Sequence, residues 1–171
     1  MHLSDVHCSQ SAVHISAVHT SDTSFGIQGL AFSWFRSYLS NRLQFVYIGN
    51  SKSPTFQSPI GVPQGSVLGP ILFSLYISPI AEIAASYGLS QQQYADDTQL
   101  YIAVSRLNLT LHVQLLEQCL THLHTWFCLN GLALNPDKSD TIIFGTRQRA
   151  LTLLSLTNID VAGSTVSISP T

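Results

Sequence analysis

The stretch QQQYADDTQLY, residues 91–101, places two adjacent aspartates, Asp96 and Asp97, between aromatic and apolar residues. Only 9 % of all residues in the chain are charged, so a pair of like charges at this position requires an explanation. The letters YA before the pair and QLYIAV after it predict a β-hairpin over residues 94–104, with both aspartates in its turn.

Two interpretations of the aspartate pair remain open at this point. Asp is a common turn residue, and a solvated turn would accommodate the pair without any function. A hairpin with its other face buried would instead hold two hard oxygen ligands rigidly, and Mg²⁺ prefers such ligands. In that hairpin we expect Tyr94 and Leu100 to be buried and at least one carboxylate to be exposed.

Composition bounds the size and the class of the protein. The chain has 171 residues, of which 45 % are hydrophobic, and its charged fraction lies far below the roughly 25 % of soluble domains. This length is typical of one domain with a real core, and the shortage of charge suggests faces that partner segments cover. The formal charge of −2 is a poor match to nucleic acid, because phosphate neutralisation provides most non-specific affinity.

Cysteines and apolar runs bear on the location of the protein. Cys8, Cys119 and Cys128 form no CxxC pair and leave an odd cysteine, which favours a reduced, intracellular environment. The N-terminus lacks the basic-then-apolar order of a signal peptide. The apolar run over residues 67–83 is interrupted by two prolines and a glutamate, so we expect no membrane span. The sequence does not distinguish nucleus from cytoplasm.

Helices and strands alternate along the rest of the chain. A short helix is expected over residues 30–41, followed by a hairpin, and a long helix over about 107–129 that ends at Asn130-Gly131. This order indicates an α+β fold with a mostly antiparallel sheet. The aromatic residues expected in the core are Trp34, Phe35, Trp126 and Phe127.

A second motif, GVPQGSVLGPILF at residues 61–73, leads into another predicted helix within residues 66–78, which we expect to pack behind the hairpin. Pro63-Gln64-Gly65 is compatible with a plain loop followed by an N-capping Ser66. Alternatively, Gly65 lets a backbone approach a ligand closely, and Gln64 offers a donor and an acceptor to a base or sugar edge.

Together, and in this order, the two motifs resemble those of the reverse transcriptase family, and the LINE-type, non-LTR retrotransposon branch fits best. FGIQGLAFSWFRSYLSNRLQFVYIG, residues 25–49, is similar to that branch's segment before its PQG motif. WFCLNGLALNPDKSDTIIFG, residues 126–145, is similar to the segment after its catalytic hairpin. The resemblance covers residues 25–168. It implies a partial polymerase palm over residues 25–171, preceded by a degenerate segment over residues 1–24.

The resemblance implies a palm-like antiparallel sheet backed by helices, and RNA-templated DNA synthesis by two-metal phosphoryl transfer. Asp96 would be a catalytic ligand of Mg²⁺, and Asp97 beside it would contribute less directly. In the family a further aspartate from an earlier strand completes the metal site. Its expected position falls about at Ser4, and the available carboxylate is Asp5, whose one-residue shift would point it to the opposite face of a strand.

Substrate contacts are implied by the same resemblance. RNA template, DNA primer and deoxynucleoside triphosphate would be the partners. The residues implied near template and nucleotide are Pro63, Gln64 and Gly65. Lys138 would be a catalytic cation near the nucleotide phosphates, or else an ordinary turn lysine. Because most of the fingers and thumb segments are not recognisable, we expect the isolated chain to be inactive. The alternative is a non-catalytic RNA-binding or protein-interaction module from a decayed element.

Overall fold

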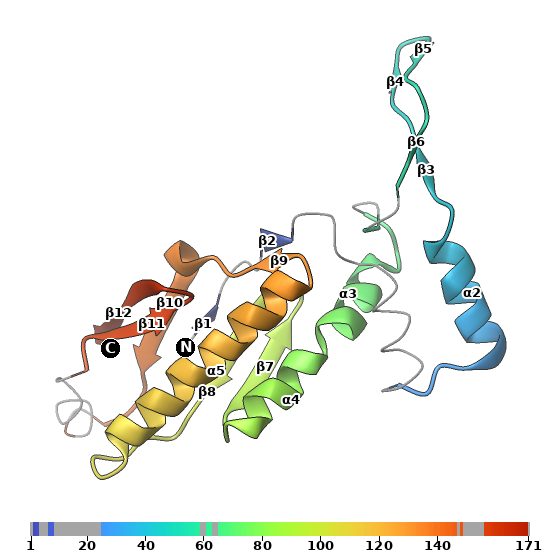
Figure 1. Cartoon of the computed structure of the whole chain (residues 1–171). Helices are drawn as coiled ribbons and strands as arrows, with labels where there is room; N and C mark the ends of the chain where they lie inside the picture. Colours follow the sequence, from blue (N-terminus) through green and yellow to red (C-terminus); the bar gives the residue numbers. More distant parts are fainter. Residues whose placement is uncertain are drawn as a thin grey trace. The chain divides into compact units, whose positions relative to one another are not determined.

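The computed structural model divides into two compact units, which are described separately here (Figure 1). One unit comprises Met1–Ser9 with Ser78–Thr171, and the other comprises Gln10–Ile77. The residues that the structure describes are 2–3, 7–8, 25–58, 61–62, 65–146, 148 and 156–170. The expected boundary between a degenerate N-terminal segment and a palm at residue 25 remains a prediction.

A six-stranded sheet forms the centre of the first unit, in the order β11-β12-β10-β1-β8-β7. Its strands are β1 (His2–Leu3), β7 (Ser90–Tyr94), β8 (Asp97–Tyr101), β10 (Ser139–Ile143), β11 (Asn158–Val161) and β12 (Ser164–Pro170). Every neighbouring pair is antiparallel except β10 with β12. A separate two-stranded sheet pairs β2 (His7–Cys8) with β9 (Leu132–Ala133). The expected α+β class with a mostly antiparallel sheet is confirmed.

Helix α5 (Leu109–Leu129) supplies most of the core of this unit. Its buried side chains recur every three or four residues, which places them on one face of the helix. They are Leu116, Cys119, Leu120, Leu123 and Phe127. This face contacts β9, β11 and the shorter helix α4 (Pro79–Ser86). The helix ends as the sequence predicts, because Gly131 adopts a φ of 68° and its N–H donates to the Cys128 carbonyl.

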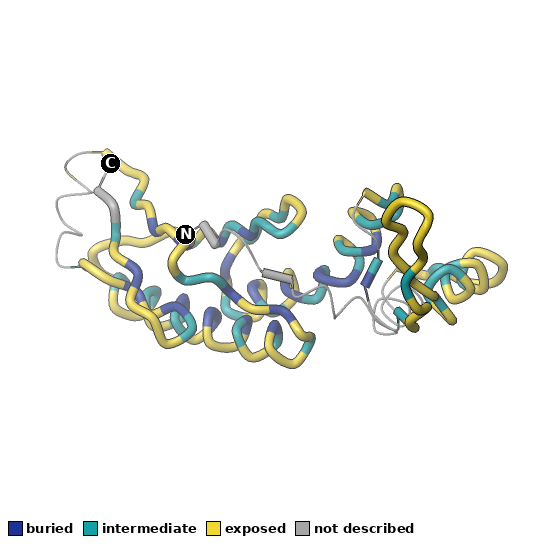
Figure 2. Tube along the Cα trace, turned by 90° about the horizontal axis from the view of Figure 1, so that it is seen from above, coloured by how far each residue is buried: buried dark blue, intermediate teal, exposed yellow. Residues whose placement is uncertain are grey.

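The other unit contains α2 (Gly29–Leu39), α3 (Gly69–Ile77) and a hairpin arm between them. The arm consists of β3 (Leu43–Gln44), β4 (Tyr47–Ile48), β5 (Ser51–Lys52) and β6 (Phe56–Gln57). β3 pairs with β6, and β4 pairs with β5. All strand residues of the arm are exposed, and α2 has no buried residue, whereas buried residues gather along α5 (Figure 2).

The expectation of four core aromatic residues is only partly met. Phe127 is fully buried, and Phe35 and Trp126 are half-buried. Trp34 is 52 % exposed, so its assignment to the core was wrong. Its indole ring stacks on Tyr38 of the same helix at 5.6 Å, because no described element packs against this face of α2.

Residues Gly69–Ser86, which span α3 and α4, form one helical stretch that is apolar and long enough to cross a membrane by length and composition alone. Core helices of other proteins meet the same criterion, and here Ser78 separates α3 from α4, which begins at Pro79. The absence of a membrane span therefore remains a prediction.

Cys119 and Cys128 both have free thiols, but they differ in burial. Burial raises the pKa of the Cys119 thiol to about 11, so this side chain stays protonated and acts as a small apolar core residue. Cys128 is exposed on the same helix. The expected reduced environment remains a prediction, and the side chain of Cys8 lies outside the described residues.

Replacement of Leu123 by alanine should lower the free energy of unfolding by about 2–5 kcal/mol, because this side chain is fully buried on α5. The matched control is Leu129→Ala on the same helix, where the leucine is 82 % exposed and the change should stay within about 0.5 kcal/mol. Urea unfolding followed by circular dichroism measures both values. Equal destabilisation by the two substitutions would contradict the placement of the core.

Candidate functional site

The aspartate pair lies where β7 turns into β8. Tyr94 pairs with Asp97, so Ala95 and Asp96 form a two-residue turn between the strands. The predicted hairpin is confirmed, but only Asp96 lies in the turn, since Asp97 is the first residue of β8. Ala95 has a φ of 52°, a left-handed conformation that few residues other than glycine adopt, and such strain recurs at functional turns.

Alternation along β8 decides which way each side chain faces. Thr98 and Leu100 are 0 % and 2 % exposed and lie on the buried face. Asp97 and Gln99 lie on the opposite face and are half-buried. Tyr94 shares the face of Asp97, because directly paired residues of two strands project to the same side.

The burial predictions for the hairpin are therefore met in part. Leu100 is buried as expected. Tyr94 is 82 % exposed, so its predicted burial was wrong, and the reason is that it pairs with Asp97 on the open face. Asp96 and Asp97 are both half-buried as whole residues, and the expectation of at least one exposed carboxylate remains a prediction.

A side-chain bridge behind the turn holds the hairpin in this conformation. The Gln93 amide donates to the Ala95 carbonyl at 2.7 Å, and its oxygen accepts a hydrogen bond from the Thr98 hydroxyl at 2.9 Å. Gln93 thus closes the turn and satisfies a hydroxyl that is fully buried. Sequence reasoning missed this residue, although its position next to the turn and on the buried side of β7 follows from strand alternation.

Lys138 lies at the same end of the sheet as the aspartates. β1 separates β8 from β10, and Leu3 pairs with both Thr98 and Ser139. Asp97 directly precedes Thr98, and Lys138 directly precedes Ser139. Because β8 and β10 are both antiparallel to β1, they run in the same direction. Two strand spacings put the backbones of Thr98 and Ser139 about 10 Å apart, and Lys138 is the last residue of the 3₁₀ helix Pro136–Lys138 that precedes β10. The structure thus brings Asp97 and the exposed Lys138 to the same end of the sheet.

The structure does not place the other predicted site residues at this end of the sheet. Pro63, Gln64 and Asp5 lie outside the described residues. Gly65 has a φ of 79°, and within the described part of the chain no heavy atom beyond its two chain neighbours lies within 4 Å of the position its Cβ would occupy. Its open surroundings are compatible with close approach of a ligand. It belongs to the other unit, as does α3, so the predicted packing of this helix behind the hairpin remains a prediction.

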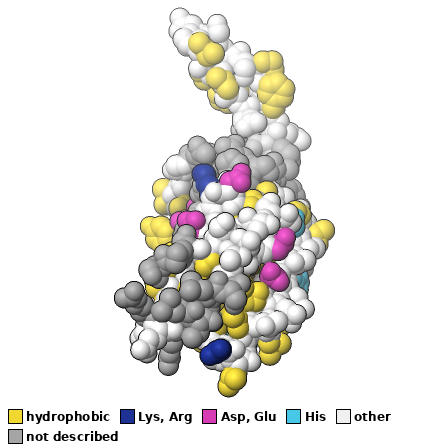
Figure 3. Space-filling view, turned by 90° about the vertical axis from the view of Figure 1, so that its left-hand side faces the viewer, with side chains coloured by type: hydrophobic (Ala, Val, Ile, Leu, Met, Phe, Trp, Pro, Cys, Tyr) yellow, Lys and Arg dark blue, Asp and Glu magenta, His cyan; other side chains and the backbone are white. Residues whose placement is uncertain are grey.

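The charges of the protein are divided unevenly along the chain. Residues 25–77 contain three cationic side chains, Arg36, Arg42 and Lys52, and no Asp or Glu. Residues 78–171 contain four cationic and seven acidic side chains. Figure 3 shows hydrophobic side chains on the arm and acidic ones on the unit that holds the sheet. The overall charge of −2 hides this division, which a count by segment would have found.

Metal-binding capacity is limited within the part of the chain that the structure describes. There, no group of three or more His, Cys, Asp or Glu side chains is placed so that it could hold a metal ion. Asp96 and Asp97 are two adjacent carboxylates of the hard type that Mg²⁺ accepts, and this ion fills its remaining positions with water and substrate phosphates. The pair can therefore contribute to a magnesium site but does not complete one.

Comparison with known proteins yields a family match over most of the chain. Residues 13–161 match the family model described as reverse transcriptase (RNA-dependent DNA polymerase). The chain is also 33 % identical over 109 residues to a protein of Drosophila melanogaster named "Probable RNA-directed DNA polymerase from transposon BS". That alignment covers 61 % of this chain and only 12 % of the relative, so the chain spans about an eighth of the relative's length.

Replacement of Gln93 by alanine should lower the free energy of unfolding by about 1–3 kcal/mol, because it leaves the buried Thr98 hydroxyl without an acceptor. Gln92→Ala, on the exposed side of the same strand, is the matched control and should change stability by less than about 0.5 kcal/mol. Urea unfolding measures both.

A double variant, Gln93→Ala with Thr98→Val, should recover part of the loss, because removing both partners of a buried hydrogen bond costs less than removing one. An additive double variant would show that the two side chains do not interact in solution.

Proposed function

The chain belongs to the reverse transcriptase (RNA-dependent DNA polymerase) family, and on this premise we propose that it is part of the palm of a polymerase that copies RNA into DNA. The observation that carries the proposal is that the YADD hairpin and Lys138 lie at the same end of the sheet, with β1 between β8 and β10. Phosphoryl transfer depends on positioned charges, and this end presents two carboxylates and one cation.

A LINE-type, non-LTR retrotransposon is the proposed source of the polymerase. Two stretches support this finer assignment by resemblance, namely residues 25–49 before the PQG motif and residues 126–145 after the hairpin. The similarity to a protein named as a probable transposon polymerase agrees with a mobile element as the source. An intracellular location follows from the proposed reaction on RNA.

Asp96 and Asp97 are the proposed ligands of Mg²⁺. When bound, this ion would activate the attacking 3′-hydroxyl and stabilise the leaving oxygen. The donor set fits a hard cation, since both side chains are carboxylates at a turn held by Gln93. Asp5 is the available candidate in the sequence for the further carboxylate of the family, and its one-residue shift from the expected position makes it a weak substitute.

Lys138 and the PQG motif are proposed to act on the substrate. The ammonium group of Lys138 would offset negative charge on the phosphates of an incoming nucleotide, at the same end of the sheet as Asp97. Gly65 and its neighbours Pro63 and Gln64 would lie along the template and the nucleotide.

Template and primer are proposed to bind the segment of residues 25–77. Its three cations and lack of acidic residues suit a phosphate backbone, in contrast to the whole chain. On the arm, the Lys52 ammonium lies 3.9 Å from the centre of the Phe45 ring, and Tyr47 is 62 % exposed. Exposed aromatic rings next to cations are the surfaces on which single-stranded bases stack.

The same features favour the alternative function, a non-catalytic RNA-binding module. Both functions require the segment of residues 25–77 with its three cations, but only the polymerase requires Asp96. A substitution at Asp96 and a substitution in this segment therefore distinguish the two functions.

Primer extension on an RNA template should be absent for the isolated chain and present when residues 25–168 replace the corresponding palm segment of a related, active element. Asp96→Asn in that chimaera should lower extension by more than about 100-fold. Mutation of a residue that only hydrogen-bonds to a metal ligand already lowers metal affinity or activity by about 10–100-fold. Glu82→Gln, on exposed α4 surface, is the control and should leave extension unchanged.

Extension by the chimaera that survives Asp96→Asn would contradict the proposed catalytic role. Extension by the isolated chain that is lost in both Asp96→Asn and Asp5→Asn would show that Asp5 completes the metal site without added segments.

Divalent cations should bind the isolated chain only weakly, with a dissociation constant in the millimolar range, because two adjacent carboxylates leave most of the shell to water. Water-proton relaxation with Mn²⁺ measures this affinity, and Asp96→Asn should abolish it while Asp140→Asn, exposed on β10, should not. Micromolar binding that is insensitive to Asp96→Asn would place the cation elsewhere.

A further inference from the structure

We propose that His124 and Cys128 of α5 form a two-ligand site for a divalent cation of the zinc class, whose remaining coordination positions stay open. The Cys128 Sγ atom lies 3.7 Å from Nε2 and 3.9 Å from Nδ1 of His124. The two residues are four positions apart, near the end of the helix. Neither the proposed polymerase function nor the family match assigns a role to either residue.

Helical spacing brings the two side chains together. Residues at positions i and i+4 lie on one helix face, a turn apart, and two histidines at this spacing bind zinc in HExxH helices. Cys128 is exposed and His124 is half-buried, so the pair lies at the surface beside the buried face of α5. The helix backbone therefore holds both donors in place before any ion binds.

The distance between sulfur and nitrogen fits a tetrahedral cation. Zinc bonds of about 2.3 Å to sulfur and 2.0–2.1 Å to nitrogen, at a tetrahedral angle, put the two donor atoms about 3.5–3.6 Å apart. The observed 3.7 Å between Cys128 Sγ and His124 Nε2 is close to this value. Rotation of the imidazole about its Cβ–Cγ bond, a torsion with broad minima, directs one nitrogen at the cation.

The two donor types select the class of cation. Thiolate and imidazole suit zinc and softer ions, whereas Mg²⁺ and Mn²⁺ prefer oxygen ligands. The site therefore differs in chemistry from the aspartate pair at the turn between β7 and β8. On binding, the thiol releases its proton to solvent as the sulfur–metal bond forms, and the cation gives up bound water.

The place of Cys128 in the helix favours a bound cation over a nucleophilic thiol. Reactive thiolates are typical of helix N-termini and of sites next to basic side chains. Cys128 lies instead in the last turn of α5, and this helix contains no Lys or Arg. Because the carbonyl end of a helix favours positive charge, a metal ion is stabilised there.

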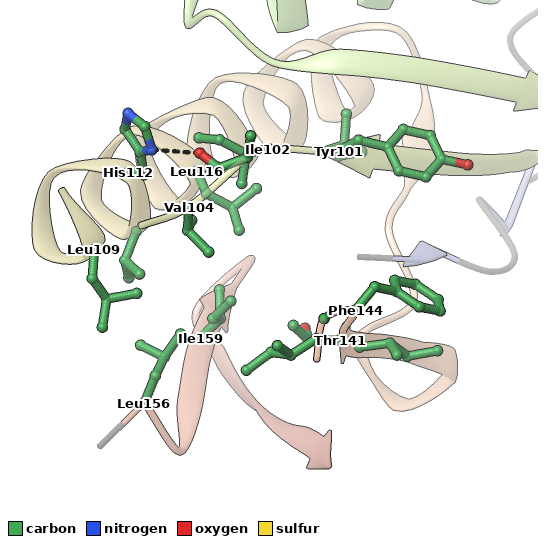
Figure 4. A pocket seen from close by; sticks show the side chains of 16 residues that line it. Tyr101, Ile102, Val104, Leu109, His112, Leu116, Thr141, Phe144, Leu156 and Ile159 are labelled. Carbon is green, nitrogen blue, oxygen red and sulfur yellow. Dashed lines mark hydrogen bonds between the residues drawn. The ribbon is translucent and has the colours of Figure 1, made fainter. Parts of the chain in front are cut away.

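The other two histidines of α5 have other partners. The Nδ1 atom of His112 lies 2.8 Å from the Ala103 carbonyl oxygen, which can only accept, so this nitrogen carries a proton and binds no metal (Figure 4). The Nδ1 atom of His122 lies 3.4 Å from the Tyr87 hydroxyl. His124 is thus the histidine of this helix that has a sulfur atom beside it.

Cobalt(II) is a suitable probe because it substitutes for zinc and gives a charge-transfer absorption when it binds sulfur. The reduced full chain with Cys8→Ser, which leaves Cys128 and the buried Cys119 as its thiols, should show this absorption saturably at one cobalt per chain. Zn²⁺ should displace the cobalt, and excess Mg²⁺ should not. Cys128→Ser should abolish the absorption. His124→Gln should weaken binding at least about tenfold, because loss of a residue that only supports a ligand already costs about 10–100-fold.

His122→Gln is the matched control, since His122 is exposed two residues earlier on α5, and it should leave cobalt binding unchanged. Cys128→His, which places two histidines at the same spacing, should keep Zn²⁺ binding while the sulfur absorption is lost. The absence of saturable binding would overturn the proposal, and so would absorption that survives Cys128→Ser or an affinity that is unchanged in His124→Gln. One cobalt per two chains would also overturn it, because the ion would then lie between copies.

Discussion

The burial of one face of β8 is the constraint from which the rest of the candidate site follows. Thr98 and Leu100 are fixed against the core, so Asp97 and its cross-strand partner Tyr94 must project to the opposite side. Burial of Thr98 requires an acceptor for its hydroxyl, and Gln93 supplies one while its amide closes the turn that carries Asp96. Core packing, polar satisfaction and carboxylate placement are therefore set by the same few residues.

The arrangement of Asp97 and Lys138 at one end of the sheet depends on β1. This two-residue strand pairs with β8 on one side and β10 on the other, which brings Asp97 and Lys138 to one level although 41 residues separate them in sequence. An apolar pocket lies toward the other end of β8, against α5, β10 and β11 (Figure 4). One strand thus connects an end of the sheet that carries charged side chains with a pocket whose described lining residues include no Asp, Glu, Lys or Arg.

Local patterns in the sequence predicted the hairpin, the long helix with its glycine stop, and the α+β class, because periodicity and turn residues act over short distances. The errors concern long-range contacts. Tyr94 and Trp34 look like core residues by type, but the first faces away from the core by strand register, and the second belongs to α2, which has no buried residue. The role of Gln93 depends on a buried hydroxyl on the next strand, which no single-strand pattern reveals. The roles of the six predicted site residues rest on resemblance, and the geometry adds support for Asp96, Asp97 and Lys138 alone.

The position of β1 in the sheet also has a consequence for how the chain folds. Leu3 pairs with Ser139, so the central strand of the sheet cannot find both neighbours until at least 136 further residues have been made. At about 5–20 residues per second, β1 waits roughly 7–30 s on the ribosome. Until it inserts, the facing edges of β8 and β10 present unpaired backbone groups, which are templates for pairing with other chains. Slow, non-local closure of this kind exposes the chain to aggregation during synthesis.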